Sequence, residues 1–263
     1  SSLRGVLRAL ATTPARTVLR AELCHDAPTR RVGLRLSQHT APTPGQASKQ
    51  PLPIPVRMML YAPDGRPYPL RRAGTDTEAA EQTVLVLTDA VADYVFEDID
   101  TRPVASLLQD FSAPVRLEFA VSDAELAFRI AHEHDDFNRF DAAQTLAERI
   151  LLAAYRRGGL DASPSLAVLL DALAKLVADE HIDPALVAEC LEPPDEISLG
   201  ERIDALDPTR LHEVREALRA AIGQHLAAAL IARREVLADA ARGRYAATPV
   251  SAHHMRRRAT DKP

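Results

Sequence analysis

The nearest approach to a catalytic motif in this sequence is HEHDD, His132 to Asp136. A helical zinc-protease motif needs two histidines one turn apart, with a glutamate beside the first. The two histidines here are two residues apart, so on a helix they diverge by about 200° and cannot share a metal ion from one face. We interpret the run as a polar helix terminus, with histidines near the negative end of the helix dipole. The pair His253-His254 fails for the same geometric reason.

The two cysteines offer no better candidate for chemistry. Cys24 and Cys190 lie far apart in the sequence and form no metal-type pair. Cys24 ends a predicted strand and Cys190 lies on a predicted short helix, so we expect each to fill core space. Two such thiols fit a reducing compartment, and we expect a cytoplasmic protein. Since there is also no glycine-rich phosphate loop, we predict no catalytic, cofactor-binding or metal-ligating residue in this chain.

Composition and charge exclude other classes of protein. The 263 residues include 46% hydrophobic and 26% charged residues, which is ordinary for a globular protein and long enough for two domains. The net charge of -5 argues against a nucleic-acid partner, and three arginines at 256–258 are a weak phosphate signal. No apolar run approaches the roughly 20 residues of a membrane span. Adjacent acids such as Asp195-Glu196 read as solvated surface charge.

The first half of the chain has the periodicity of strands. In RVGLRLSQ, for example, Val32, Leu34 and Leu36 alternate with polar residues and would face one side of a sheet. About seven short strands separated by Pro, Gly and Asp turns predict an antiparallel immunoglobulin-like sandwich over residues 14–120. The strand candidates include residues around 18–23 and 32–36, then 54–61, 83–87, 94–97 and 113–121.

After Ser122 the period changes to that of helices. Ser122 and Glu125 have capping-box spacing, and Gly158-Gly159 supply a left-handed stop for a helix from about Asn138 to Arg157. Three cap–proline pairs predict further helix starts, and leucines along 166–176 form one stripe. The fold class is therefore an α+β multidomain protein, with the sandwich followed by an all-α domain at 121–247. Residues 1–13 read as the remnant of a preceding helix and 248–263 as a polar, frayed tail. The cap–proline pairs are Ser163-Pro164, Asp183-Pro184 and Asp207-Pro208.

Several longer stretches resemble aminopeptidase N, the alanyl aminopeptidase family of zinc gluzincins. Thr40 to Leu70 carries TP-x-Q-x-x-KQPL-x-IP, then an apolar strand and an acidic-Gly turn. The resemblance is collinear from about Thr13 to Arg244, which makes it much more specific than a single motif. It continues in PVASLLQDFSAPVRLEF (103–119), DDFNRFDAAQTL (135–146) and DEHIDPALVAECLEPPDE (179–196).

This resemblance implies the Ig-like linker domain and the start of the C-terminal helical domain, with the catalytic domain absent. The family's zinc belongs to that catalytic domain, whose H-E-x-x-H and Gly-x-Met-Glu-Asn motifs do not occur here, so we predict that this chain alone is inactive. The expected function is that of a spacer and part of the helical cover of an aminopeptidase active site. The expected partner is an aminopeptidase catalytic domain, in the same or a separate chain. Candidate interdomain residues at the sandwich-to-helix joint are Phe137, Arg139, Phe140 and Asp141.

Other interpretations remain open at this stage. Phe137 and Phe140 would equally well pack the helical core, and Arg139 with Asp141 would then be a surface pair worth little. The chain would be an excised piece, a split gene product or a degenerate fragment, or else a stand-alone interaction or scaffold module derived from this family. An enzyme with an unrecognised site is the third class. If further helices normally cover the leucine stripes at 166–176 or 218–230, the chain would self-associate through them.

Overall fold

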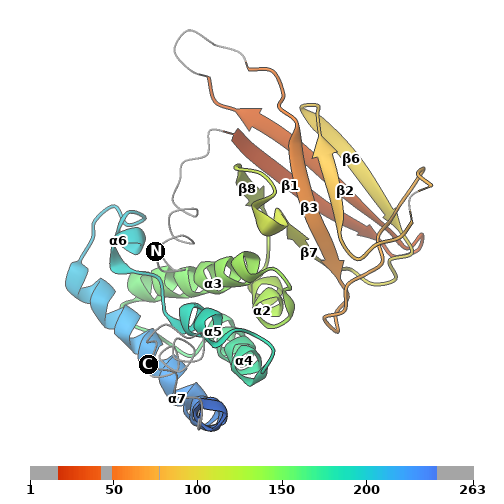
Figure 1. The fold of residues 1–263 in the computed structure, drawn as a ribbon. Coiled ribbons are helices and arrows are strands. Elements are labelled where there is room, and N and C mark those ends of the chain that lie inside the picture. Colours follow the sequence, from red (N-terminus) through yellow and green to blue (C-terminus); the bar gives the residue numbers. More distant parts are fainter. Residues whose placement is uncertain (1–16, 43–48, 77, 242–263) are drawn as a thin grey trace, which may run out of the picture. The chain divides into compact units, whose positions relative to one another are not determined.

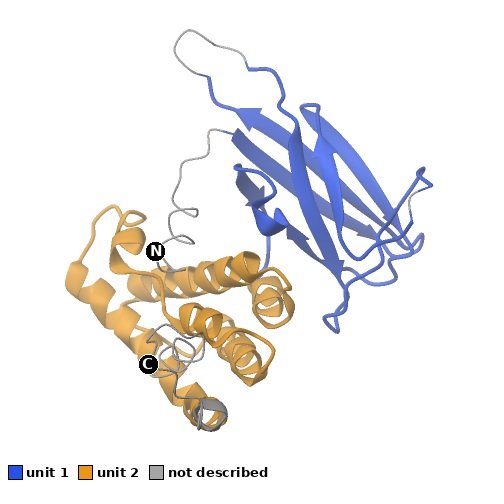
Figure 2. Cartoon of the chain, viewed as in Figure 1, with its two compact units in different colours: residues 1–122 blue, residues 123–263 orange. Residues whose placement is uncertain are grey.

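The computed structural model describes residues 17–42, 49–76 and 78–241. The chain divides into two compact units, residues 1–122 and 123–263, which are described separately (Figure 2). The predicted helix remnant at 1–13, the tail at 248–263 and the pair His253-His254 lie outside the described residues. Within the described ranges, no helix is both long enough and apolar enough to cross a bilayer.

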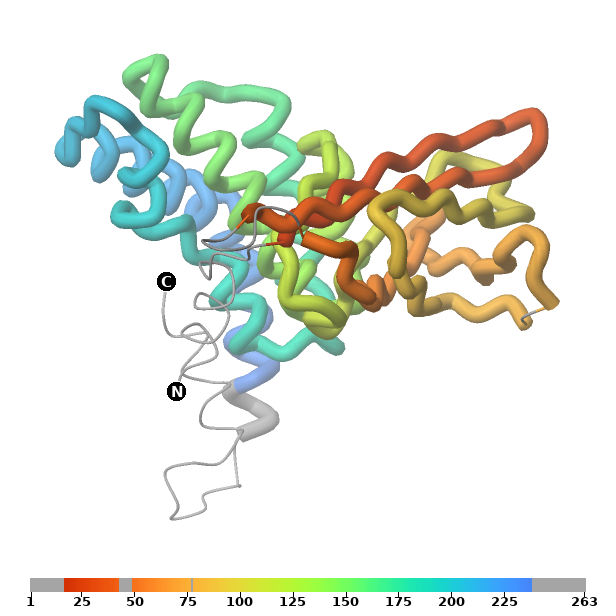
Figure 3. The backbone as a smooth tube through the Cα atoms, turned by 90° about the horizontal axis from the view of Figure 1, so that it is seen from above, coloured from red at the N-terminus to blue at the C-terminus, as the bar shows by residue number. Residues whose placement is uncertain are grey.

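The first unit is built from two sheets (Figure 1). The larger sheet has the strand order β4-β6-β2-β1-β8, and the smaller has the order β5-β3-β7. The long β1–β2 hairpin appears in red in Figure 3. The predicted Ig-like sandwich followed by helices is confirmed. The strands are β1 (Thr17–Asp26), β2 (Arg31–Thr40), β3 (Ile54–Tyr61), β4 (Arg71–Arg72), β5 (Thr83–Leu87), β6 (Val91–Glu97), β7 (Val104–Leu107) and β8 (Arg116–Phe119).

The alternation of side chains along the strands explains the core of this unit. In β2, Val32, Leu34 and Leu36 are fully buried, whereas the residues between them are exposed or half-buried. Opposite them, β3 contributes Val56 and Met58, which are also fully buried. With little aromatic side-chain volume in the sequence, the core between the two sheets is mainly aliphatic.

The structure differs from the sequence-based strand assignment at three strands. The two-residue strand β4 and the strand β7 were not predicted, because the first is too short to show a period and Ser106 in the second is fully buried. The remaining difference is β8, which pairs with β1 in parallel, with Leu19 opposite Leu117. Every other strand pair is antiparallel within the described residues, as predicted.

The second unit contains six helices within the described residues: α2 (Asp123–His132), α3 (Asp136–Arg157), α4 (Pro164–Ala178), α5 (Pro184–Leu191), α6 (Glu196–Gly200) and α7 (Pro208–Ala241). Helix α3 begins before the predicted Asn138, because the Asp135 carboxylate caps it by accepting a hydrogen bond from the Asn138 amide at 2.8 Å. It ends at Gly158 with φ of 91°, as predicted.

The cap–proline pairs begin helices as the sequence predicts. Ser163 caps α4 and Asp183 caps α5, each followed by proline in the first turn. Asp207 accepts hydrogen bonds from two amides at the start of α7. Asp195 and Glu196 are partly exposed carboxylates, but each also has a partner that was not predicted: Asp195 caps the unpredicted α6, and Glu196 lies 2.9 Å from the His212 ring.

The core of the helical unit buries both leucine stripes. In α4, Leu169, Leu173 and Leu176 are at most 1% exposed, and α4 packs against α2 and α7. In α7, Leu218 and Leu226 are buried in the same way. Leu170 and Leu230, in the same two stripes, are half-buried. Helices of the same unit thus cover most of both stripes, and self-association through exposed helices stays a prediction.

Candidate functional site

A buried polar cluster lies at the turn between the end of α2 and the start of α3. The Glu133 carboxylate is fully buried, and its Oε1 accepts hydrogen bonds from the His134 amide at 2.9 Å and the Asp135 amide at 3.2 Å. Its Oε2 lies 3.5 Å from Nε of Arg129, whose side chain is also buried. An ionised group is this deeply buried only when charge and hydrogen bonds compensate it. Glu133 therefore fixes the turn between the two helices.

Arg139 completes this cluster from the first turns of α3. Its Nη1 donates to the Ile130 carbonyl at 2.7 Å, and its Nη2 donates to the Glu133 carbonyl. These carbonyls lie at the end of α2, where a helix lacks acceptor partners and carries partial negative charge. The expectation of a surface Arg139–Asp141 pair is wrong: Arg139 is buried, and it caps α2 instead.

The other predicted joint residues lie on the same stretch of α3. Phe140 is buried, which agrees with helical-core packing, whereas Phe137 and Asp141 are half-buried. Burial raises the pKa of the Asp141 carboxyl, and the nearby Arg129 charge partly opposes that rise. The structure brings all four residues onto one segment. Their role as an interface between the units stays a prediction.

The histidines of the HEHDD run mark a helix end, as predicted. His132 is the last residue of α2, and its ring lies 4.8 Å from that of Phe128, one turn earlier. Sequence reasoning missed the full burial of Glu133 and the capping role of Asp135. Because Asp135 lies three residues before Asn138, N-cap spacing was the signal that could have found it.

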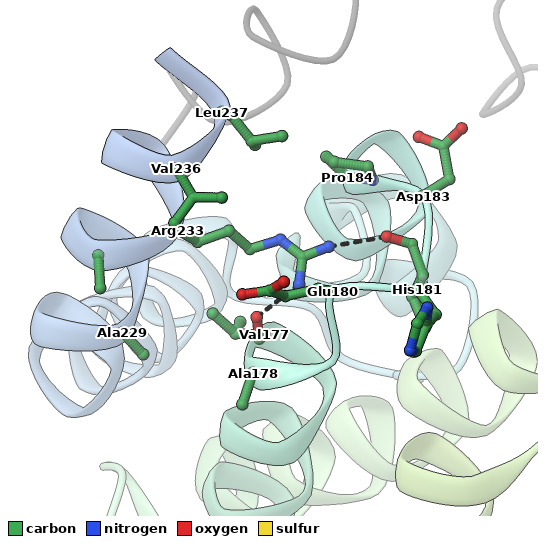
Figure 4. Close-up of a pocket in the computed structure, with 12 residues that line it drawn as sticks. Val177, Ala178, Glu180, His181, Asp183, Pro184, Ala229, Arg233, Val236 and Leu237 are labelled. Atoms are coloured by element: carbon green, nitrogen blue, oxygen red, sulfur yellow. Dashed lines mark hydrogen bonds between the residues drawn. The ribbon is translucent and has the colours of Figure 1, made fainter. Parts of the chain in front are cut away.

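A second polar feature is a pocket of about 450 Å³ formed by α4, α5 and α7 (Figure 4). Arg233 of α7 is 8% exposed, and its guanidinium donates to the carbonyls of Val177 and Ile182 at 2.7 Å each and also to that of Asp179. Burial lowers the pKa of Arg233, although Asp179, Glu180 and Asp183 oppose that shift. Arg233 thus holds the α4–α5 connection against α7. Nothing in the Ala- and Leu-rich sequence of α7 predicted that Arg233 would be buried and would bind these carbonyls.

The cysteines are in different environments. Cys190 is 4% exposed, and burial raises the pKa of its thiol to about 12, with the Arg139 charge opposing that rise. It therefore fills core space as a protonated thiol, as expected. The expectation is wrong for Cys24, which is exposed: Leu19 and Ala21 face the core, so Cys24 points outward on β1.

No metal site emerges from these residues. Within the described ranges, no group of three or more His, Cys, Asp or Glu side chains could hold a metal ion. The polar clusters found here are built from arginines that donate to backbone carbonyls and carboxylates that accept from backbone amides. Such contacts fix helix ends and connections, and they present no activated nucleophile or acid–base pair.

Two family models match the chain in consecutive segments. Residues 13–120 match a domain of unknown function, DUF3458, described as having an Ig-like fold. Residues 123–262 match a second domain of unknown function, DUF3458_C, described as ARM repeats.

Similar proteins match over much of this chain but over a small part of their own length. Aminopeptidase N of Escherichia coli (strain K12) is 40% identical over 200 residues, which cover 76% of this chain and 22% of that protein. Aminopeptidase N of Haemophilus influenzae is 30% identical over 77% of this chain and 23% of that protein. The chain thus spans less than a quarter of the length of these relatives.

A solved structure supports the fold. The crystal structure of Legionella pneumophila aminopeptidase A in complex with aspartic acid matches with a TM-score of 0.70. The match covers 93% of this chain and 27% of that chain, at 20% sequence identity. At this identity the likeness shows a shared fold.

Proposed function

Because the chain belongs to the DUF3458_C family and is aminopeptidase N-like along both units, we propose that it is a non-catalytic segment of a zinc-dependent aminopeptidase. In this role the Ig-like unit is a spacer, and the helical unit is part of the cover over the active site. The partner is an aminopeptidase catalytic domain in the same or a separate chain. We further propose that the protein works in the cytoplasm, where its two thiols stay reduced.

One observation carries this proposal. The similarity to Escherichia coli aminopeptidase N extends over 200 residues, a length that neither unit alone could supply, yet it covers only 22% of that protein. The described residues then show what a supporting segment needs: helix ends capped by Asp135 and Arg139, and a connection held by Arg233. Helices with capped ends keep a fixed arrangement, which a domain that covers part of an active site needs.

The zinc of such an enzyme does not fit the residues described here. No His, Cys, Asp and Glu side chains converge as ligands in the described ranges. We therefore derive no step of peptide hydrolysis from this chain. Purified chain incubated with zinc and alanyl-p-nitroanilide should release no nitroaniline above a buffer control, and turnover that scales with added zinc would contradict a non-catalytic role.

The cover role has its own test in a chimera. The full chain would replace the matching segment of Escherichia coli aminopeptidase N, and a second chimera would carry only its Ig-like unit, residues 1–122. The measured quantity is the ratio of kcat/KM for alanyl-p-nitroanilide to that for a long peptide. A helical cover predicts a higher ratio in the full chimera, because it excludes long peptides. Equal ratios in two folded chimeras would reject the cover role.

The candidate joint residues are tested in the chain itself. If Phe137 contacts the Ig-like unit, Phe137→Ala should speed hydrogen exchange in strands of that unit as well as in α3. If Phe137 only packs the helical core, exchange should change in the helices alone. Phe140→Ala is the matched comparison, because the Phe140 side chain is buried at 9% exposure and belongs to the helical core.

A further inference from the structure

Strand β5 forms an open edge of the smaller sheet. It pairs with β3 on one side only, because the order of that sheet within the described residues is β5-β3-β7. Along β5, Leu85 and Leu87 are buried, whereas Val84 and Val86 are 48% and 52% exposed. Because side chains alternate along a strand, these two valines lie on the outer face of the sheet. The strand therefore has an exposed apolar face next to its open side.

The hydrogen bonds of β3 show which backbone groups of β5 face outward. The Arg57 amide donates to the hydroxyl of Ser112 at 3.0 Å, and Ser112 follows β7, so Arg57 directs its backbone groups away from β5. Arg57 lies opposite Val84, and residues opposite each other in an antiparallel ladder exchange both hydrogen bonds or neither. The amide and carbonyl of Val84 therefore point to the open side. Val86 has the same orientation, and its carbonyl accepts a hydrogen bond from the Tyr94 hydroxyl at 3.1 Å.

The other edge strands of the two sheets are protected. Strand β4 consists of two exposed arginines, and β8 carries an ion pair between Arg116 and Glu118. Short strands and charged side chains are common means of preventing an edge from pairing with another chain. In β7, Ser106 is fully buried. Strand β5 has neither a charged residue nor a proline, so among the edge strands that the structure describes it is the one suited to accept a further strand.

The charge around β5 indicates the chemistry of such a strand. Residues 73–101 contain eight acidic residues and no Lys, Arg or His, although the whole chain has 37 acidic residues against 32 Lys and Arg. Glu81 precedes β5 and Asp89 follows it, and both are exposed. Of the neighbouring bases, Arg57 of β3 already pairs with a carboxylate, and Arg72 of β4 lies over an aromatic ring of β6. Both ends of the open edge are therefore acidic.

This charge disfavours a second copy of the chain as the occupant. If two β5 strands paired antiparallel about Leu85, Glu81 of each chain would lie opposite Asp89 of the other. Like charges that face each other across a strand pair are destabilising. An extended segment with Lys or Arg at both ends would instead place opposite charges together.

We propose that β5 is a docking edge for an extended, basic segment of a partner protein. The segment adds to the smaller sheet as a fourth strand and bonds to the backbone of Val84 and the amide of Val86. Its alternate apolar side chains pack on the exposed faces of these two valines, and its terminal Lys or Arg residues face Glu81 and Asp89. Backbone hydrogen bonds and apolar contact supply the affinity in this mode of recognition, whereas the charges select the partner.

A synthetic peptide tests this edge in the full chain. The probe is fluorescein-labelled Lys-Arg-Thr-Val-Thr-Val-Thr-Arg-Lys, and its binding is followed by fluorescence anisotropy. One control peptide has Glu in place of all four basic residues. The other has N-methyl groups on its two valine amides, which removes the donors that would face β5. We expect the probe to bind at least about tenfold more tightly than either control.

Variants of the chain locate the binding site. Val86→Lys should weaken binding of the probe about tenfold or more, because it places a positive charge on the docking edge. Val91→Lys is the matched control, since Val91 is also 52% exposed but lies on β6 of the larger sheet. Circular dichroism checks that both variants are folded.

Hydrogen exchange measured by NMR reports on the backbone itself. The outward-facing amides of Val84 and Val86 should exchange fast in the free chain and become protected when the probe is bound. The Leu85 amide faces β3, so it should be protected in both states.

Several outcomes would overturn the proposal. Equal affinities for the three peptides would do so, as would equal effects of the two lysine variants. Slow exchange at Val84 and Val86 in the free chain would show that the edge is already covered. A dimer in sedimentation that Val86→Lys converts to a monomer would make a second copy the occupant.

Discussion

Replacing Arg233 by methionine should destabilise the helical unit through loss of a defined set of contacts. The guanidinium donates to three carbonyls, those of Val177, Asp179 and Ile182, around the end of α4 and the start of α5. Methionine keeps the apolar stem but leaves these carbonyls without that donor. The α4–α5 connection should therefore separate more readily from α7.

The magnitude follows from those three bonds. Hydrogen bonds with a charged donor contribute roughly 1.5–3 kcal/mol each, and the burial of Arg233 offsets part of that gain. Water in the pocket can also satisfy some of the freed carbonyls. We expect Arg233→Met to lower the free energy of unfolding by roughly 2–3 kcal/mol. In a thermal melt this corresponds to a fall of roughly 8–12 °C in the midpoint temperature.

The assay is unfolding of the full chain in urea, followed by the helical circular dichroism signal. Arg234→Met is the matched control, because Arg234 is the exposed neighbour on the same helix and its replacement removes the same charge. Its effect should stay within about 0.5 kcal/mol. If both variants unfold at the same urea concentration, the three carbonyl contacts do not stabilise the unit, and the predicted role of Arg233 is refuted.

Three further predictions concern single side chains. Gly158→Ala should cost about 1 kcal/mol in the same assay, because Gly158 has φ of 91° and its Cβ would meet the Arg210 guanidinium at 3.1 Å. Iodoacetamide should label the exposed thiol of Cys24 in the native chain but Cys190 only after unfolding, as peptide mass spectrometry would show. Asp141→Asn should stabilise the chain at pH 7, because the raised pKa of Asp141 means that its ionisation costs stability as the pH rises.

Each of these has a control or a contrary outcome. Gly159→Ala should leave the free energy of unfolding nearly unchanged, since an added Cβ there has no neighbour within 4 Å. If the two glycine variants lose equal stability, the left-handed backbone of Gly158 is not the cause. Native labelling of Cys190 would show that its site opens readily. The gain from Asp141→Asn should fade as the pH falls toward about 4, near the pKa of an unfolded aspartate. Asp123→Asn should instead destabilise at pH 7, because hydrogen bonds from Ser165 and Arg149 lower the pKa of Asp123.

The sequence by itself determined the features that depend on neighbouring residues. Alternation in β2 placed Val32, Leu34 and Leu36 in the sandwich core, and the pairs Ser163-Pro164 and Asp183-Pro184 placed two helix starts. These signals are local, because strand period and helix caps depend on residues only a few positions apart. The collinear resemblance determined the family in the same way, since it needs only the order of motifs.

The tertiary structure decided what each buried polar side chain contacts. Arg139 caps the end of α2, and Arg233 donates to carbonyls at the end of α4 and in the α4–α5 connection, from 51 to 56 positions away in sequence. Glu133 is fully buried in a run that reads as exposed polar charge. Periodicity cannot reveal such partners, because a guanidinium on one helix finds unpaired carbonyls on another only after the helices have packed. The sequence thus determined the helix starts that carry a cap–proline pair and the helix end at Gly158, and only packing decided which arginine would satisfy which helix end.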